Sequence, residues 1–346
     1  MAPVGPNCSP ITSPGGRAKE KSLRNLIIRL SCLAVAVSTA SCAGPKGQPF
    51  PALDRNNPNL VYCCGGPEVF LIDIDQTRRD PAARLWFWKV EDSPQIRPEH
   101  RAWFEVMDEC KPLDDGAMLL VSASSGGGIA VIRVADKACA FYASGRNAHS
   151  IAMIQPPGMS EHVPPLYAGA FSLRTDELRL YLSHGGMNPR PEAFGASPVW
   201  QTPLLEAHGA VWDVGRGILW ALGAKELLKI KVGDYHKPAP EILSRHALPG
   251  QGGHDLVRWD ANHLALTVWR GTHLFDLNEE TFAPLPGLAD KRGVKGLSRH
   301  PKTGRVLFTQ AARGDNFTDQ IQFLDAPPLK LSIKTLYKAR WSAAAW

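Results

Sequence analysis

The 346-residue sequence lacks several features that would point to common functions. It has no block of five or more like charges, and its formal net charge is only +6, so a charged tail for nucleic acid is not expected. It has no G-x-S-x-G nucleophile motif, and its nearest approach to a phosphate loop, Ser124–Gly128, lacks the lysine and helix that must follow. No apolar run is long enough to span a bilayer. We therefore expect no nucleic-acid partner, no nucleotide loop and no membrane-spanning segment.

The first 42 residues have the layout of a bacterial secretion signal. Lysines and arginines between positions 17 and 29 precede the apolar run Leu30–Val37, and small residues then lead to Cys42. This ending resembles a lipobox, in which Cys42 would be lipidated and would tether the protein to a membrane. The alternative is a soluble export signal cut near Ala43. We expect a signal over 1–42, a tether over 43–58 and a location in the cell envelope, or alternatively secretion.

The rest of the composition indicates a globular, turn-rich β protein. Hydrophobic residues make up 44% of the chain, and it contains 31 glycines, 29 prolines and 10 tryptophans. Export would permit disulfides, but Cys63, Cys64, Cys110 and Cys139 allow several pairings among which the sequence does not choose. The fold is large enough not to need them.

A repeat runs through residues 59–346. Four copies share a small or apolar residue, a basic one, a small or polar one and an apolar run: Ala148–Ile151, Ala207–Ala210, Gly253–Leu256 and Val294–Leu297. The clearest copy continues with strands expected at 210–212, 218–222, 227–232 and 241–247. Four short strands joined by tight turns correspond to one propeller blade. About 48 residues for each blade would give six blades, within the range of propeller repeats.

The two ends of the chain predict how the ring closes. The first copy begins with a second-strand pattern at 60–63 and has no inner strand before it, whereas an unused strand, Ala339–Ser342, occurs at the far end. The last strand would then complete the first blade and leave no open sheet edge. We predict an all-β, six-bladed propeller of four-stranded blades, closed in this way.

Each repeat carries one basic residue at what we take to be the same point of its inner strand. Inner strands line the central channel, so these residues should meet at its mouth. The residues are Arg340, Lys111, His149, His208, His254 and Lys295. Such a ring should repel itself unless something negative lies within it. We therefore expect an anionic ligand, a metal held by histidines, or both.

Alternatives remain open for this ring. The basic residues could instead pair with nearby carboxylates such as Glu109, Glu206 and Asp255, which would give them a structural role. His149, His208 and His254 could form a three-histidine metal site for a divalent ion such as manganese or calcium, but no local ligand spacing supports it. Asp255 and Asp319 are further candidate ligand contacts, although Asp319 also fits a turn cap.

The repeat motifs resemble those of a known family. The segments Glu206–Asp213, Leu219–Gly223, Gly253–Leu256, Gly293–Gly296 and Lys338–Trp341 are similar to an uncharacterised family of exported bacterial β-propeller proteins. The resemblance covers nearly all of the mature chain and implies the fold but no activity. The chain departs from the family where the Pro-rich stretch Gln155–Pro165 stands in place of a strand pair. The basic mouth is more distantly similar to the sites of oligogalacturonate lyases and other propeller polysaccharide lyases.

Two functions follow as expectations. The first is an exported protein that binds an acidic carbohydrate through Lys111, Lys295 and Arg340, and cleaves it by β-elimination with His149, His208 or His254 as the catalytic base. The second is a non-catalytic surface lipoprotein that binds an anionic glycan or metabolite with the same ring. We expect a monomer in either case.

Overall fold

The computed structural model describes residues 54, 56–113, 116–155, 165–173, 175–183, 197–235, 237–312 and 314–343. The predicted signal and Cys42 lie outside these residues. The segment Phe50–Trp346 forms one compact unit. No helix among the described residues has the length and apolar character needed to cross a membrane.

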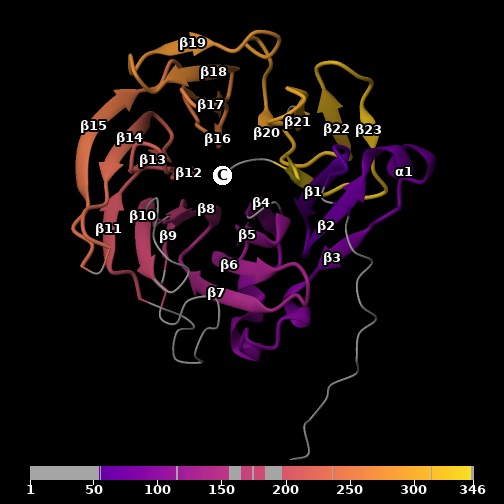
Figure 1. Ribbon diagram of the computed structural model, residues 1–346, viewed down its shortest axis with the longest axis horizontal. Coiled ribbons are helices and arrows are strands. Elements are labelled where there is room, and N and C mark those ends of the chain that lie inside the picture. The colour runs from indigo at the N-terminus through magenta and orange to yellow at the C-terminus, as the bar shows by residue number, and fades with distance from the viewer. Residues whose placement is uncertain are drawn as a thin grey trace, which may run out of the picture. The chain divides into compact units, whose positions relative to one another are not determined.

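The described strands form six sheets of four strands, and each sheet is one blade of a propeller (Figure 1). Blade 1 contains β24 (Leu336–Trp341), β1 (Leu60–Gly65), β2 (Glu68–Asp73) and β3 (Trp86–Trp88). Blade 2 contains β4 (Met107–Leu113), β5 (Met118–Ala123), β6 (Gly128–Arg133) and β7 (Cys139–Ser144). Blade 3 contains β8 (Ala148–Ile154), β9 (Leu166–Phe171), β10 (Glu177–Leu182) and β11 (Trp200–Pro203).

The other three blades follow the same order from the centre outward. Blade 4 contains β12 (Gly209–Asp213), β13 (Ile218–Leu222), β14 (Glu226–Lys231) and β15 (Glu241–Ala247). Blade 5 contains β16 (Asp255–Arg258), β17 (His263–Val268), β18 (Gly271–Asp276) and β19 (Phe282–Pro284). Blade 6 contains β20 (Val294–Arg299), β21 (Val306–Gln310), β22 (Gln320–Phe323) and β23 (Leu329–Lys330). The predicted fold class is confirmed.

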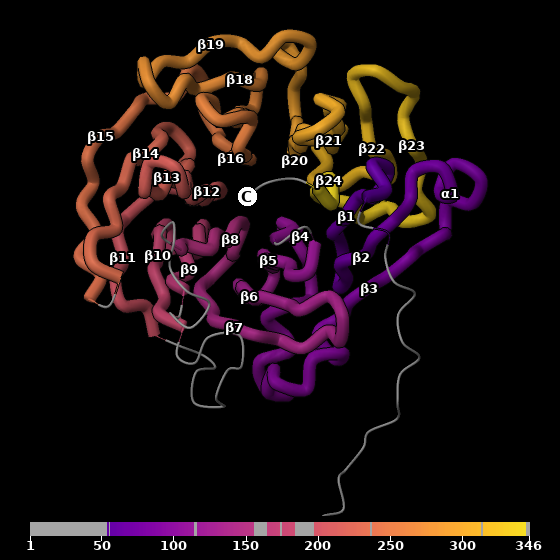
Figure 2. The backbone as a smooth tube through the Cα atoms, in the orientation of Figure 1, coloured from indigo at the N-terminus to yellow at the C-terminus, as the bar shows by residue number. Residues whose placement is uncertain are grey.

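The last strand closes the ring as predicted. β24 pairs antiparallel with β1, with Cys63 opposite Ala339, and Figure 2 shows the two strands side by side near the centre. Blade 1 is therefore built from both ends of the described chain. The inner edge of β1 is paired rather than exposed, which removes an open edge that could pair with another chain.

Apolar side chains pack between blades rather than within one central core. The described residues form six buried apolar clusters, and each lies between two neighbouring blades. Trp86 and Trp88 lie in the cluster between blades 1 and 2, and Trp220 lies between blades 4 and 5. Strand side chains alternate between the two faces of each sheet, so both faces can bury apolar groups against neighbours.

The structure gives blade 3 four described strands and adds elements that the pattern does not predict. Most of the Pro-rich stretch 155–165 lies outside the described residues. A short helix, α1 (Ile74–Arg79), follows β2 and is capped by Asp73, whose side chain accepts from the Gln76 N–H. Two 3₁₀ helices, Val90–Asp92 and Pro98–Phe104, join β3 to β4.

Candidate functional site: the channel mouth and an adjoining cavity

Six equivalent positions mark the start of the inner strands at the channel mouth. In β4, β8, β20 and β24 the pairing register shifts at one extra residue, which is Asp108, His149, Lys295 and Tyr337 respectively. In the other two blades the equivalent residues, His208 and His254, come directly before β12 and β16 and donate their N–H to a second-strand carbonyl. A bulge adds one residue to a strand and changes the direction of its side chain, so we take the bulged residue as the equivalent mouth position of each inner strand.

The predicted ring is therefore wrong in two of its six members. Lys111 and Arg340 lie three residues further along their strands than Asp108 and Tyr337, which occupy the equivalent places. Lys111 and Arg340 fit the basic pattern of the repeat by residue type, although they lie deeper in β4 and β24. The mouth contains three histidines, one lysine, one aspartate and one tyrosine, and the self-repulsion expected of six cations does not arise there.

A left-handed backbone residue precedes four of the mouth positions by two residues. The φ angles are 55° at Asn147, 45° at Glu206, 69° at Gly252 and 69° at Gly293. This region is disfavoured for residues with a Cβ, and glycine adopts it without penalty. Asp176 accepts the Glu206 N–H at 2.8 Å and so helps to hold the turn ahead of His208. A turn of the same backbone conformation thus leads into the mouth residue in each of blades 3 to 6.

The three histidines contact one another across adjacent blades. The His149 and His208 rings stack with centroids 4.0 Å apart, and His254 meets His208 edge-on at 5.2 Å. Nδ1 of His208 lies 2.8 Å from the Glu206 carbonyl oxygen. Because a carbonyl only accepts, Nδ1 carries the proton and Nε2 keeps the lone pair.

Burial keeps these imidazoles neutral. Burial, together with Lys338 and Lys295, lowers the pKa of His149 to about 3. Burial and the charge of Lys295 lower the pKa of His254 to about 2. The pKa of His208 lies well below its usual value because of burial and the neighbouring His149. All three are uncharged near neutral pH.

Asp108 is the carboxylic acid of the mouth. Burial raises the pKa of its carboxyl to about 7. Its Oδ2 lies 3.0 Å from Nδ1 of His149, although the two atoms are not aligned as a hydrogen bond. Burial lowers the pKa of Lys295, which Asp108 partly offsets. The mouth can therefore change its charge through Asp108 near neutrality.

Below the mouth, buried ion pairs join the inner strands of blades 1, 2 and 5. Arg340 of blade 1 donates to Glu109 of blade 2 at 2.9 Å and to Asp255 of blade 5 at 2.7 Å, and also to the Leu297 carbonyl at 2.6 Å. Lys338 lies 3.3 Å from Glu109 and 3.2 Å from Asp255. All four charged side chains are at most 1% exposed. We call these four residues the charge plug.

The plug and Lys111 are internally satisfied. Burial alone would raise the pKa of Asp255, but Arg340 and Lys338 outweigh it and hold that pKa well below its usual range. Lys111 donates to the Ser150 hydroxyl and to the Ala210 carbonyl, each at 2.8 Å, and burial lowers its pKa to about 8. Arg340 therefore pairs with Glu109 and Asp255, and Lys111 lies 3.7 Å from Glu109, as the alternative of pairing with nearby carboxylates predicts.

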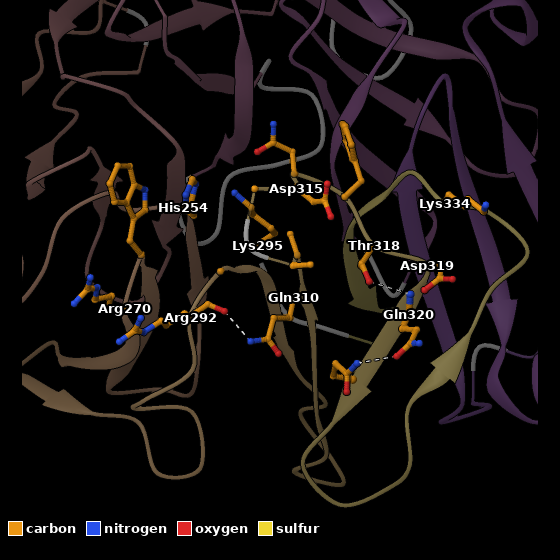
Figure 3. Close-up of a pocket in the computed structure, with 18 residues that line it drawn as sticks. His254, Arg270, Arg292, Lys295, Gln310, Asp315, Thr318, Asp319, Gln320 and Lys334 are labelled. Carbon is orange, nitrogen blue, oxygen red and sulfur yellow. Dashed lines mark hydrogen bonds between the residues drawn. The ribbon is translucent and has the colours of Figure 1, made fainter.

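A large cavity opens beside the mouth over blades 5 and 6. Its volume is about 1420 Å³, and Figure 3 shows His254 and Lys295 at one side of it with Asp319 and Lys334 at the other. The remaining polar lining includes Arg270, Arg292, Asp315, Asn316 and the glutamines 310, 320 and 322. Trp269 and Phe317 supply aromatic surface, and 58% of Trp269 is exposed.

The structure brings only some of the predicted site residues to this cavity. His254, Lys295 and Asp319 line it. Asp319 is 3.7 Å from Lys330. Among the described residues no group of three or more His, Cys, Asp or Glu side chains could hold a metal ion, so the histidine metal site gains no support. The four cysteines 63, 64, 110 and 139 are free and buried.

The sequence reasoning missed Trp269, Arg270, Arg292 and Asp108. Trp269 and Arg270 lie in the turn between β17 and β18, and Arg292 comes just before β20, so none of the three falls at the repeated basic position of its blade. A tryptophan next to an arginine just after the 263–268 strand was the available signal. Asp108 is identified as a mouth residue only from the strand-pairing register in the structure, which shows the bulge in β4.

Comparisons with known proteins agree with this fold and leave the function open. Residues 69–160, which run from β2 past β8, match a family of unknown function, DUF6528. No curated protein matches the chain. A chain from a nidogen/laminin complex is similar at TM-score 0.53 and 10% identity, covering 83% of this chain and 99% of that one. A functionally unknown protein from Desulfotomaculum acetoxidans is similar at TM-score 0.50 and 8% identity, covering 77% and 74%. Such low identities show the fold alone.

Proposed function

We propose that this six-bladed propeller binds an acidic carbohydrate in the cavity over blades 5 and 6. The observation that carries the proposal is the combination of lining groups in one cavity of about 1420 Å³. Trp269 offers a ring face to a sugar, the amides of Gln310 and Asn316 can hydrogen-bond hydroxyls, and Arg270 and Arg292 can meet a negative group.

The charge balance of the lining favours an anion. Arg270, Arg292, Lys295 and Lys334 provide four cations, whereas Asp315 and Asp319 provide two carboxylates. Asp319 is already close to Lys330. A cavity with excess positive charge raises the local concentration of anions and discriminates against cations.

Binding without chemistry is the function the geometry supports best. A general base works well when its pKa lies near the working pH, and the pKa of His254 is only about 2. His254 is also the one mouth histidine that lines the cavity. β-Elimination is the second candidate, favoured by the free Nε2 lone pair of His208 and by an Asp108 pKa of about 7.

Calorimetric titration with galacturonate oligomers and with neutral galactose oligomers tests the proposal. We expect the acidic oligomers to bind at least tenfold more tightly, and Trp269→Ala to weaken binding. Phe87→Ala is the matched control, because Phe87 is a 44% exposed aromatic on the outer strand of blade 1. Equal binding of neutral and acidic oligomers, or unchanged binding by Trp269→Ala, would contradict the proposal.

Incubation of the same acidic oligomers with the protein separates binding alone from β-elimination. If the protein only binds, the incubation should give no unsaturated product, which absorbs in the ultraviolet. Product that disappears in His208→Gln would instead establish the lyase. We further propose that the protein works in the cell envelope, tethered through Cys42, which palmitate labelling of the wild type and of Cys42→Ser would test.

A further inference from the structure

Two arginines that line the cavity lie opposite each other in the backbone. Arg270, between β17 and β18, and Arg292, before β20, form an isolated antiparallel bridge that joins blades 5 and 6. Directly opposite residues in such a pair carry Cβ atoms about 5 Å apart and side chains on one face. Figure 3 shows both guanidinium groups on the same side of the cavity.

Neither arginine has a partner that would justify this placement. Both side chains are exposed, and the part of the chain that the structure describes gives neither guanidinium a hydrogen bond or an ion pair. Three other surface arginines, Arg133, Arg245 and Arg305, each pair with a carboxylate. Like charges directly opposite in a β pair destabilise it, so the arrangement lacks its counter-charge.

The surroundings fix both the backbone and the aromatic neighbour. Gln310 donates to the Arg292 carbonyl at 2.7 Å, and the Gly293 N–H donates to the Trp269 carbonyl at 3.3 Å. A Cβ on Gly252 would lie only 2.1 Å from Nε1 of Trp269. The indole therefore packs against the bare Gly252 backbone on one side, while much of its surface stays exposed.

We propose that Arg270 and Arg292 form a clamp for one carboxylate or sulfate group of the bound glycan, whose sugar ring stacks on Trp269. The proposal rests on the proposed function and assigns its anion subsite. Two planar guanidinium forks match the oxygens of such a group and supply the missing negative charge. A ligand that brings its acidic group to this point removes the repulsion between the two arginines.

Charge-neutral ligands and variants test the clamp together. Arg270→Gln and Arg292→Gln should each weaken binding of galacturonate oligomers about tenfold or more, and the double variant by little more than either single one. Full methyl esterification of the oligomer removes its charge and should cost a similar factor. The ester should then bind wild type and both variants alike. Arg79→Gln is the control, because Arg79 is an exposed arginine at the end of α1 in blade 1.

The outcomes separate the clamp from the function. If both Gln variants bind acidic oligomers as wild type does, while Trp269→Ala weakens binding, the clamp is refuted and the function stands. If the wild type binds no oligomer, the proposed function is contradicted, and the clamp is then tested with inorganic sulfate. Sulfate at constant ionic strength should then raise the wild-type melting temperature and have less effect on both variants. An equal rise in all three proteins indicates an adventitious ion only and refutes the clamp.

Discussion

Replacing Arg340 by methionine should be among the most damaging single changes in this protein. The guanidinium donates to Glu109, to Asp255 and to the Leu297 carbonyl, and its side chain is fully buried. Methionine keeps much of the volume and removes every donor. Two carboxylates would then remain buried with Lys338 as their main cation.

The expected loss follows from what is left behind. Removing one partner of a buried ion pair typically costs about 3–5 kcal/mol, because the remaining charge is neither hydrated nor paired. Net stabilities of single domains are about 5–15 kcal/mol. We expect Arg340→Met to fall in the upper part of the 3–5 kcal/mol range, since two carboxylates lose a partner at once. The triple variant Arg340→Met/Glu109→Gln/Asp255→Asn should recover part of this loss.

Urea unfolding at several pH values provides the assay. The pKa values of Glu109 and Asp255 lie below their usual range, so their contribution is present above about pH 4 and is lost as the pH falls through the folded values. The deficit of Arg340→Met should therefore be largest at neutral pH and should shrink in acid. Arg245→Met removes an exposed arginine paired with Glu226 and should cost at most about 1 kcal/mol. Equal losses in the two variants would refute the argument.

Three further predictions concern the mouth. The wild type should lose stability as the pH rises from about 4 through 7, because the raised pKa of Asp108 makes the folded state hold its proton more tightly. Asp108→Asn should reduce this loss, and urea unfolding curves over that pH range check the prediction. The wild type should also lose stability as the pH falls below 6.5, because the His254 imidazole binds a proton in the unfolded state and stays neutral in the folded state. His254→Gln should reduce this loss, and an unchanged dependence of stability on pH below 6.5 would contradict the argument. Glu206→Gly should raise stability by about 0.5–1 kcal/mol by relieving a φ of 45°, whereas Gly252→Ala should lower it and disturb Trp269, as melting and indole fluorescence would show.

The fold was predictable from the sequence because its signals are local and repeated. Turn residues, apolar runs and the unmatched strand at 339–342 together determine the blade number and the closure. The site was predictable only in part. His149, His208, His254 and Lys295 lie at equivalent mouth positions because their flanking residues repeat.

The remaining site features depend on register and on distant partners. Residue type indicates Lys111 as the basic residue of blade 2, whereas the bulge that marks the mouth falls on Asp108, three residues earlier. The charge plug joins residues 229 and 231 positions apart in Lys338–Glu109 and Arg340–Glu109 contacts. Nothing in a single sequence connects such positions. The cavity likewise forms from loops of two blades whose separation only the folded ring defines.

The position of the plug cations has a consequence for assembly. Lys338 and Arg340 belong to β24, the last described strand, whereas Glu109 and Asp255 belong to blades 2 and 5. Before β24 is added, Glu109 has Lys111 at 3.7 Å as its nearby cation, and Asp255 lacks both cations of the plug. Only a ring with the right number of blades brings both Glu109 and Asp255 beside β24. The final strand can therefore form all of its ion pairs only when the ring is complete.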